Sequence, residues 1–414
     1  MLKNNRNFSL YITGLAISLF GTFTYNFAIG LYVLALTKSA QSFATTLIVG
    51  ILPVVLLSPI SGTLVDRYSK KHLLVIADTL SGILFLLLFL LFKMHHMTLS
   101  VIYLTTFIIS ILSTCFDNAM LSAKTLLFEA KDYERVNATS QVIRSVAIIS
   151  APLTGGLIYG FVDIGTFVLI NGLSFLLSAL IETQLKFPEV DVKVSSKTLN
   201  IGDNLKEGLA YLRSKPQIKG YILYFLVLNF ILGFSVTVPV PYIINTLLQK
   251  PPEVYGAIEA TFPIGLIIGG VTITKLSKKY SFERILLHIL KVIAVLLILI
   301  GLTAHLKGLQ NDNILLVLYF GIIHLFFGMA ISYVDIPIIT LLQRNVDQAY
   351  LGRVMGIIMS LIKSVYPVGL ALSGFFCNII SPYVLPIIGA SIALLLNVYM
   401  MNFSMMPDSL AEIR

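Results

Sequence analysis

The chain of 414 residues is poor in charge and in cysteine. Only 12% of its residues are charged, about half the share found in ordinary soluble domains, which excludes a soluble globular fold and a disordered chain. Its two cysteines, Cys115 and Cys377, both lie in apolar runs, so a disulfide framework and a metal cluster are excluded as well. The sequence also lacks a P-loop and an HExxH motif, which argues against ATP-driven pumping and metal-dependent hydrolysis.

What the sequence has is hydrophobic length. Hydrophobic residues make up 57% of the chain, and its mean hydropathy is +0.90. A helix needs about 20 apolar residues to cross a bilayer, and it must satisfy its own backbone hydrogen bonds there. Runs of that kind are expected near 8–36, 43–65, 72–93, 98–123, 136–160, 162–185, 217–247, 253–275, 283–305, 313–342, 352–378 and 383–403.

One long polar stretch divides these runs into six and six. We therefore predict an N-terminal bundle over 1–185, a central loop over 186–216 and a C-terminal bundle over 217–414. Of the 29 Lys and Arg residues, 22 fall at the termini and in the loops on the same side as the termini, and only 4 fall in the opposite loops. This bias predicts a multi-pass protein of the cell membrane with both termini in the cytoplasm. The net charge of +9 is then mainly topological.

The two predicted bundles also share sequence features. Asp117 precedes Arg135 by 18 residues, and Asp335 precedes Arg353 by the same distance. The loop after the second run, from Gly62, matches the loop after the eighth in its Gly, Ser and Lys-Lys positions, and runs 5 and 11 each carry a proline and a glycine. These echoes predict an all-α membrane protein made of two pseudo-symmetric six-helix bundles, an arrangement common in transporters.

The first of these loops also carries a family resemblance. Its residues match G-x-L-x-D-R-x-x-[RK]-[RK] at Gly62, Leu64, Asp66, Arg67, Lys70 and Lys71. With twelve runs and a central loop, the chain resembles the major facilitator superfamily. The stretches 132–138 and 343–354 resemble its drug-exporter branch, which includes macrolide-efflux proteins. The resemblance implies a gate in which Asp66, with Arg67 as its partner, contacts the start of the eleventh helix near Gly352. The alternative is that Arg67, Lys70 and Lys71 only fix the topology.

Ionisable side chains at membrane depth are costly and usually face a cavity or a partner. Asp117 and Asp335 occupy matching places in the two halves and are our candidates for proton coupling; a fixed ion pair of Asp117 with Arg144 is the alternative. Further cavity charges are predicted at Arg144, Glu259 and Lys363. Asp78 and Glu182 lie near the ends of their runs, where snorkelling to the interface is expected.

Polar and helix-bending residues complete the predicted site. Tyr25, Asn26, Asn229 and Tyr242 are substrate-cavity candidates, with ordinary helix packing as the alternative for each. His324, inside the tenth run, is a proton relay or a packed histidine. Bending is expected at Pro152, Gly155, Gly156 and Pro367, and a broken segment at Pro239 and Pro241.

Together these features predict a secondary active exporter of amphipathic small molecules, driven by proton antiport. The first alternative keeps the fold but exports an endogenous siderophore-like or lipid-like metabolite, and the second is a polytopic membrane enzyme or receptor. No cofactor or metal is expected, because the proton gradient supplies the energy. The expected partners are a small-molecule substrate and membrane lipids, without nucleic acid, around a monomer.

Overall fold

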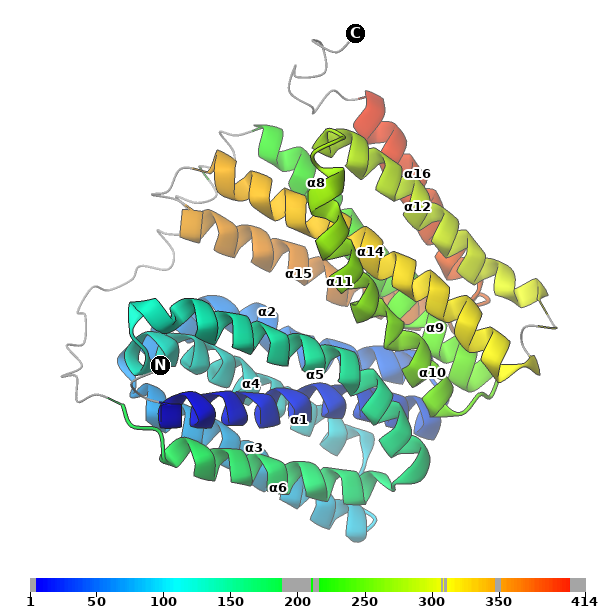
Figure 1. Ribbon diagram of the computed structural model, residues 1–414. Coiled ribbons are helices and arrows are strands. Elements are labelled where there is room, and N and C mark those ends of the chain that lie inside the picture. The colour runs from blue at the N-terminus through cyan, green and yellow to red at the C-terminus, as the bar shows by residue number, and fades with distance from the viewer. Residues whose placement is uncertain are drawn as a thin grey trace. The chain divides into compact units, whose positions relative to one another are not determined.

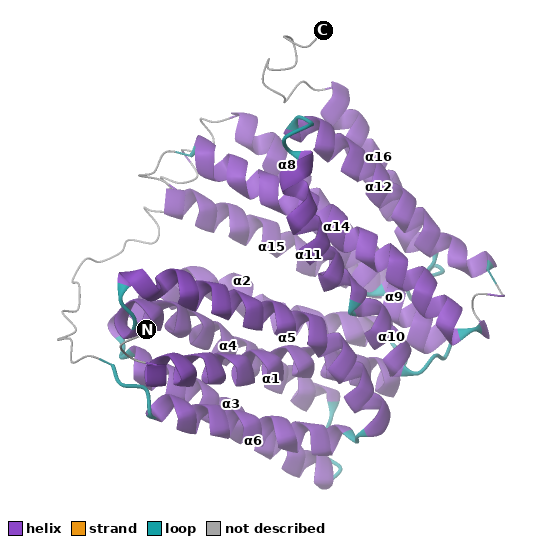
Figure 2. Ribbon diagram, viewed as in Figure 1, coloured by secondary structure: helices purple, strands orange, loops and turns teal. Residues whose placement is uncertain are grey.

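The computed structural model describes residues 5–187, 210, 216–306, 308, 311–346 and 351–402. Within these ranges the regular structure is helical throughout (Figure 2), which confirms the predicted all-α class. Ten of the described helical segments are long and apolar enough to cross a membrane. The helices α5 and α15 occupy the other two predicted runs.

The chain divides into two compact units, one holding residues 1–36 and 46–198 and the other holding 37–45 and 199–414. Figure 1 labels the helices of both units. The first contains most of α1 (Asn5–Thr37) and of α2 (Ala40–Arg67), together with α3 (Lys70–Lys93), α4 (Leu99–Leu127), η1 (Ala130–Asp132), α5 (Tyr133–Phe161) and α6 (Ile164–Thr183). The second contains α8 (Pro216–Leu232), η2 (Gly233–Thr237), α9 (Pro239–Pro241), η3 (Tyr242–Leu247), α10 (Pro252–Glu259), α11 (Thr261–Leu276), α12 (Phe282–Leu302), η4 (Thr303–His305), α14 (Asn313–Asn345), α15 (Leu351–Phe376) and α16 (Val384–Asn402).

In the N-terminal unit, α3 and α6 pack side by side along a glycine contact (Figure 1). A Cβ atom on Gly172 would lie 3.2 Å from the carbonyl oxygen of Gly82, and one on Gly82 would lie 3.0 Å from that of Gly172. Small residues of this kind let two membrane helices approach closely. Beside them Phe85 stacks on Phe175 at 5.4 Å and meets Tyr25 edge-on at 4.7 Å, so the interior between α1, α3 and α6 is densely packed.

In the C-terminal unit, α11 and α14 use the same device. A Cβ atom on Gly269 would come within 2.8 Å of the Met329 carbonyl oxygen, and Gly265 and Gly328 are equally confined against the partner backbone. Ser332 then donates a hydrogen bond to the Leu266 carbonyl at 2.7 Å. The close approach holds α11 and α14 at a fixed distance from each other.

Prolines account for two departures from regular helix in this unit. The eighth predicted run is divided at Ala260 into α10 and α11, because Pro263 has no N–H to donate to the Glu259 carbonyl four residues earlier. The expected broken segment at Pro239 and Pro241 takes the form of π-helical turns on either side of α9. Both features place side chains away from the positions a straight helix would give them.

Candidate functional site

The N-terminal unit contains a cavity of about 430 Å³ whose lining comes from α1, α4 and α5. On its wall Arg144 Nη2 donates a hydrogen bond to Asp117 Oδ1 at 3.0 Å. The exposed fractions of the two side chains are 38% for Arg144 and 44% for Asp117. The ion pair therefore forms, but it borders an open cavity and both groups keep contact with solvent.

The rest of the lining mixes positive charge, amides and apolar surface. Lys124 also lines the cavity and donates a hydrogen bond from Nζ to Asn137 Oδ1 at 3.1 Å. Two cationic side chains thus accompany one carboxylate. The other lining residues are Tyr11, Leu15, Asn118, Met120, Leu121, Ser140 and Gln141. Such a surface suits an amphipathic molecule that offers hydrogen-bond acceptors or negative charge.

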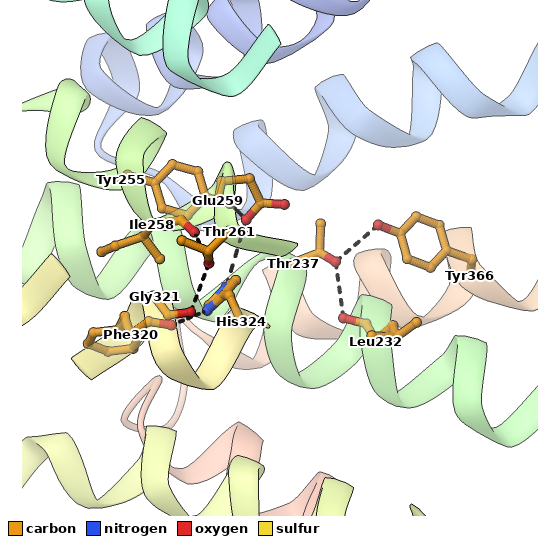
Figure 3. A network of polar contacts seen from close by, with 10 residues as sticks. All are labelled: Leu232, Thr237, Tyr255, Ile258, Glu259, Thr261, Phe320, Gly321, His324 and Tyr366. Carbon is orange, nitrogen blue, oxygen red and sulfur yellow. Dashed lines mark hydrogen bonds and ion pairs between the residues drawn. The ribbon is translucent and has the colours of Figure 1, made fainter. Parts of the chain in front are cut away.

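The C-terminal unit holds a second polar centre, around Glu259 at the end of α10 (Figure 3). The hydroxyl of Tyr255 donates to Glu259 Oε2 at 3.0 Å. His324, on α14, is buried and places Nε2 at 3.7 Å from the same carboxylate oxygen. Glu259 is 30% exposed, so solvent reaches the pair from the side of the carboxylate.

The hydrogen bonds fix the tautomer of His324. Its Nδ1 lies 2.9 Å from the Phe320 carbonyl oxygen, which can only accept, so Nδ1 carries a proton. A neutral His324 therefore directs the lone pair of Nε2 toward the Glu259 carboxylate, and two acceptors would face each other. One additional proton, on either group, converts this repulsion into an attractive contact.

A neighbouring hydroxyl chain joins two further helices. Thr237 Oγ1 donates to the Leu232 carbonyl at 3.1 Å and lies 3.0 Å from the hydroxyl of Tyr366 (Figure 3). Because the single hydroxyl proton of Thr237 is already used, Tyr366 is the donor in this second contact. The chain links η2 with α15 close to Pro367.

Two acidic residues that sequence reasoning assigned to the membrane interface are buried. Asp78 on α3 is 2% exposed and Glu182 on α6 is fully buried, so the expectation that both snorkel is wrong. Ser18 donates to Asp78 Oδ2 at 2.5 Å. The prediction was wrong because it relied on the position of both residues near helix ends. Their side chains turn inward toward α1 and not along the helix toward solvent.

Comparison with known proteins shows which family this architecture belongs to. The model of the family described as "Major Facilitator Superfamily" matches residues 11–370. The chain belongs to the Major Facilitator Superfamily. Macrolide efflux protein A of Streptococcus pyogenes is 26% identical over 384 residues, which is 91% of each chain.

Solved structures of transporters share the fold. The nucleoside transporter NupG has a TM-score of 0.70 at 15% identity and covers 95% of this chain and 98% of its own. A bacterial homologue of the iron transporter ferroportin, in an inward-facing state, has a TM-score of 0.72 at 16% identity, over 96% and 98%. These relatives are transporters and efflux proteins, so the protein is a multi-pass membrane transporter and not an enzyme.

The superfamily loop signature lies at the junction of α2 and α3. The backbone of α2 ends at Arg67 and α3 begins at Lys70. The surroundings of Gly62 and the side chains of Asp66 and Arg67 lie outside what the structure describes, so the predicted gate stays a prediction. Lys71 Nζ donates to the Leu185 carbonyl at 2.9 Å. This lysine thereby ties the start of α3 to the end of α6.

The remaining predicted charges are separate from the two polar centres. Asp335 is half-buried on α14, and none of the described residues forms a hydrogen bond or ion pair with it. Lys363 is exposed on α15. Their roles, like those of Asn26, which is exposed, and Tyr242, which is half-buried, stay predictions.

Several other candidates pack between helices. Tyr25 is fully buried and its hydroxyl lies 3.1 Å from that of Thr106, and Asn229 donates to the Phe225 carbonyl of its own helix. Gly155 admits the ring of Phe27, because a Cβ atom there would lie 2.7 Å from Phe27 Cδ1. Pro152 and Gly156 lie inside α5 and Pro367 lies inside α15, and the expected bending at these residues stays a prediction.

Proposed function

We propose that the protein is a secondary active exporter of amphipathic small molecules that exchanges its cargo for protons by alternating access. The observation that carries the proposal is the cavity of the N-terminal unit, where the Asp117 and Arg144 ion pair borders apolar walls. A secondary transporter needs a site that binds a partly charged, partly apolar molecule reversibly. The efflux proteins among its relatives support export as the direction.

Proton exchange is assigned to Glu259 with His324. We assign the exchanged proton to the site between Glu259 Oε2 and His324 Nε2, which lie 3.7 Å apart, and the 30% exposure of Glu259 gives this site access to water. Loss of that proton would leave two acceptors facing each other, which would weaken the contact between α10 and α14. Asp117 and Asp335 remain further candidates for the same role, and the cytoplasmic gate is assigned to Asp66.

Transport into everted membrane vesicles tests the proposal. With both termini cytoplasmic, export appears as accumulation inside the vesicle, and an acidic lumen should drive it. We expect uptake of a labelled macrolide when the lumen is acidified, and its collapse when a protonophore is added. Uptake that follows an imposed sodium gradient and ignores the pH gradient contradicts proton exchange.

A second cargo class is favoured by the charge of the cavity. Among the lining residues, the two cations Lys124 and Arg144 outnumber the single carboxylate of Asp117. An acidic, oxygen-rich metabolite of siderophore type therefore fits the cavity better than a cationic drug. Lys124→Met separates the two possibilities, because it should weaken uptake of an acidic hydroxamate or catecholate and leave macrolide uptake unchanged. An equal loss for both cargoes contradicts the charge argument.

A further inference from the structure

Three helices of the N-terminal unit bring a group of oxygen atoms together away from the cavity. This carboxyl cluster consists of Gly14 and Ser18 on α1, Asp78 on α3, and Ser178 and Glu182 on α6. Ser18 donates to Asp78 Oδ2 at 2.5 Å and lies 3.0 Å from Ser178 Oγ. Ser178 Oγ in turn donates to the Gly14 carbonyl at 3.3 Å. All five residues are buried.

The carboxylate of Glu182 lacks the partners that a buried charge requires. Both of its oxygen atoms are inaccessible to solvent and neither has a hydrogen-bond partner among the described residues. Two cations at this end of the bundle are engaged elsewhere: Lys71 donates to the Leu185 carbonyl and Arg6 to Gln184 Oε1. Two ionised carboxylates in one buried cluster, with no cation bonded to them among the described residues, would create a strong negative potential there.

On the side of α1, the cluster meets the helix backbone at Gly14. Gly14 has no side chain, and a Cβ atom at that position would lie 3.3 Å from Glu182 Oε1 and 3.6 Å from Ser178 Oγ. The glycine thus leaves the carboxylate facing bare helix backbone. Ser18, one turn further along α1, supplies a hydroxyl at the same face.

We propose that the carboxyl cluster binds a hard divalent metal cation, with Ca²⁺ as the best match. Its donors are all oxygen: two carboxylates, two hydroxyls and the Gly14 carbonyl, up to seven atoms in total. Ca²⁺ takes about six to eight oxygen ligands, whereas Mg²⁺ demands octahedral geometry and keeps several waters. Nitrogen and sulfur donors, which softer metals prefer, are absent from the set.

A proton alone satisfies the cluster less well. Protonation of Glu182 removes one charge, but the charge of Asp78 then stays buried with no cation bonded to it among the described residues. A divalent ion balances both carboxylates and gives the two free oxygen atoms of Glu182 a partner. Bound there, it would fix α1 against α3 and α6, and α1 carries Tyr11 and Leu15 into the cavity wall.

The test measures binding directly, so its outcome does not depend on the cargo or on proton exchange. The purified protein in detergent is titrated with ⁴⁵Ca²⁺ by equilibrium dialysis, and its thermal unfolding is followed with Ca²⁺, Mg²⁺ or Na⁺ at constant ionic strength. We expect saturable binding of about one Ca²⁺ per chain and a Tm that rises with Ca²⁺ concentration. Glu182→Gln and Asp78→Asn should each weaken the affinity at least tenfold.

Two further variants keep the test decisive. Glu129→Gln, which removes an exposed carboxylate outside the cluster, should bind Ca²⁺ like the natural chain. The double variant Asp78→Asn with Glu182→Gln should fold without metal, because the buried charges are gone, and its Tm should ignore Ca²⁺. The proposal is overturned if the natural chain and the double variant respond equally to Ca²⁺, or if only pH and no metal ion changes the Tm of the natural chain.

Discussion

The ion pair of Asp117 and Arg144 allows a test that separates a cargo-binding role from a structural one. Replacing Asp117 by asparagine keeps the shape of the side chain but removes its charge and leaves Arg144 without an ionic partner. At 3.0 Å the two charges attract each other by about 1.4 kcal/mol in a fully aqueous dielectric. Both side chains are more than one-third exposed, so solvent screening and side-chain entropy reduce the net contribution to less than about 1 kcal/mol.

We therefore expect Asp117→Asn to change Tm by less than about 4 °C, while export falls at least tenfold. Circular dichroism of the purified protein gives the first quantity, and vesicle uptake gives the second. The exchange variant, with Asp117→Arg and Arg144→Asp together, should restore the Tm without restoring export, because the cavity then presents its charges from the wrong helices.

Full export by the exchange variant would refute this reasoning. A purely structural ion pair between α4 and α5 works equally well when its two charges are exchanged, whereas a cargo-binding pair does not. A loss of stability above about 2 kcal/mol in Asp117→Asn would refute the solvent-screening step. Either result would favour a structural role for the ion pair and a cargo site in another part of the protein.

Four more predictions concern other parts of the chain. Glu259→Gln should abolish the response of export to an imposed pH gradient while cargo binding, measured by calorimetry, persists. Gly269→Leu should destabilise the protein by about 1–3 kcal/mol, measured by thermal unfolding, because a Cβ atom there would meet the backbone of α14 at 2.8 Å. Asp163→Ala should cost about 1 kcal/mol, since Asp163 accepts a hydrogen bond from the Thr166 amide at 3.0 Å and caps α6. The Thr166 hydrogen bonds lower the pKa of Asp163, so this stabilisation is present at neutral pH and should fade as pH falls below about 4. Asp66→Asn should reduce vesicle transport at normal protein abundance, because it removes the charge assigned to the gate.

Controls make these outcomes readable. Gly308→Leu introduces the same side chain at a glycine with no atom within 4 Å of the new Cβ position, so it should leave Tm unchanged where Gly269→Leu lowers it. Unfolding curves of Asp163→Ala and the natural chain should converge in acid; a constant difference down to about pH 2 contradicts the capping argument. Full pH-gradient-driven export by Glu259→Gln would exclude Glu259 from proton exchange.

Much of the fold follows from local patterns in the sequence. The last run was expected at 383–403 and α16 spans Val384–Asn402, and the sixth was expected at 162–185 and α6 spans Ile164–Thr183. Apolar length sets these limits, because only about 20 consecutive apolar residues can cover the bilayer core. The division of the eighth run was predictable in principle from Pro263, whose missing N–H interrupts the helix four residues earlier.

Contacts between helices were harder to predict. Asp78 and Glu182 each lie near a helix end, and position along the helix favoured the interface. Which way a side chain turns depends on the neighbour it meets, and that neighbour is distant in sequence. A signal did exist on α6, where Ser178 and Glu182 are one turn apart on the same face, but a single face does not identify the helix opposite it.

The proposed duplication made Asp117 and Asp335 equivalent, yet their surroundings differ. Asp117 has a guanidinium at 3.0 Å, whereas none of the described residues pairs with Asp335. In the C-terminal unit, a carboxylate instead lies near a histidine, with Glu259 Oε2 at 3.7 Å from His324 Nε2. Arginine stays charged at every physiological pH, while histidine changes charge between about pH 5 and 8. A permanently charged pair suits recognition of a polar cargo, and a titratable pair suits uptake and release of protons. If the halves have divided the work in this way, exchanging Glu259 for aspartate should shift the pH dependence of export and leave cargo selectivity unchanged, whereas changes at Arg144 should do the reverse.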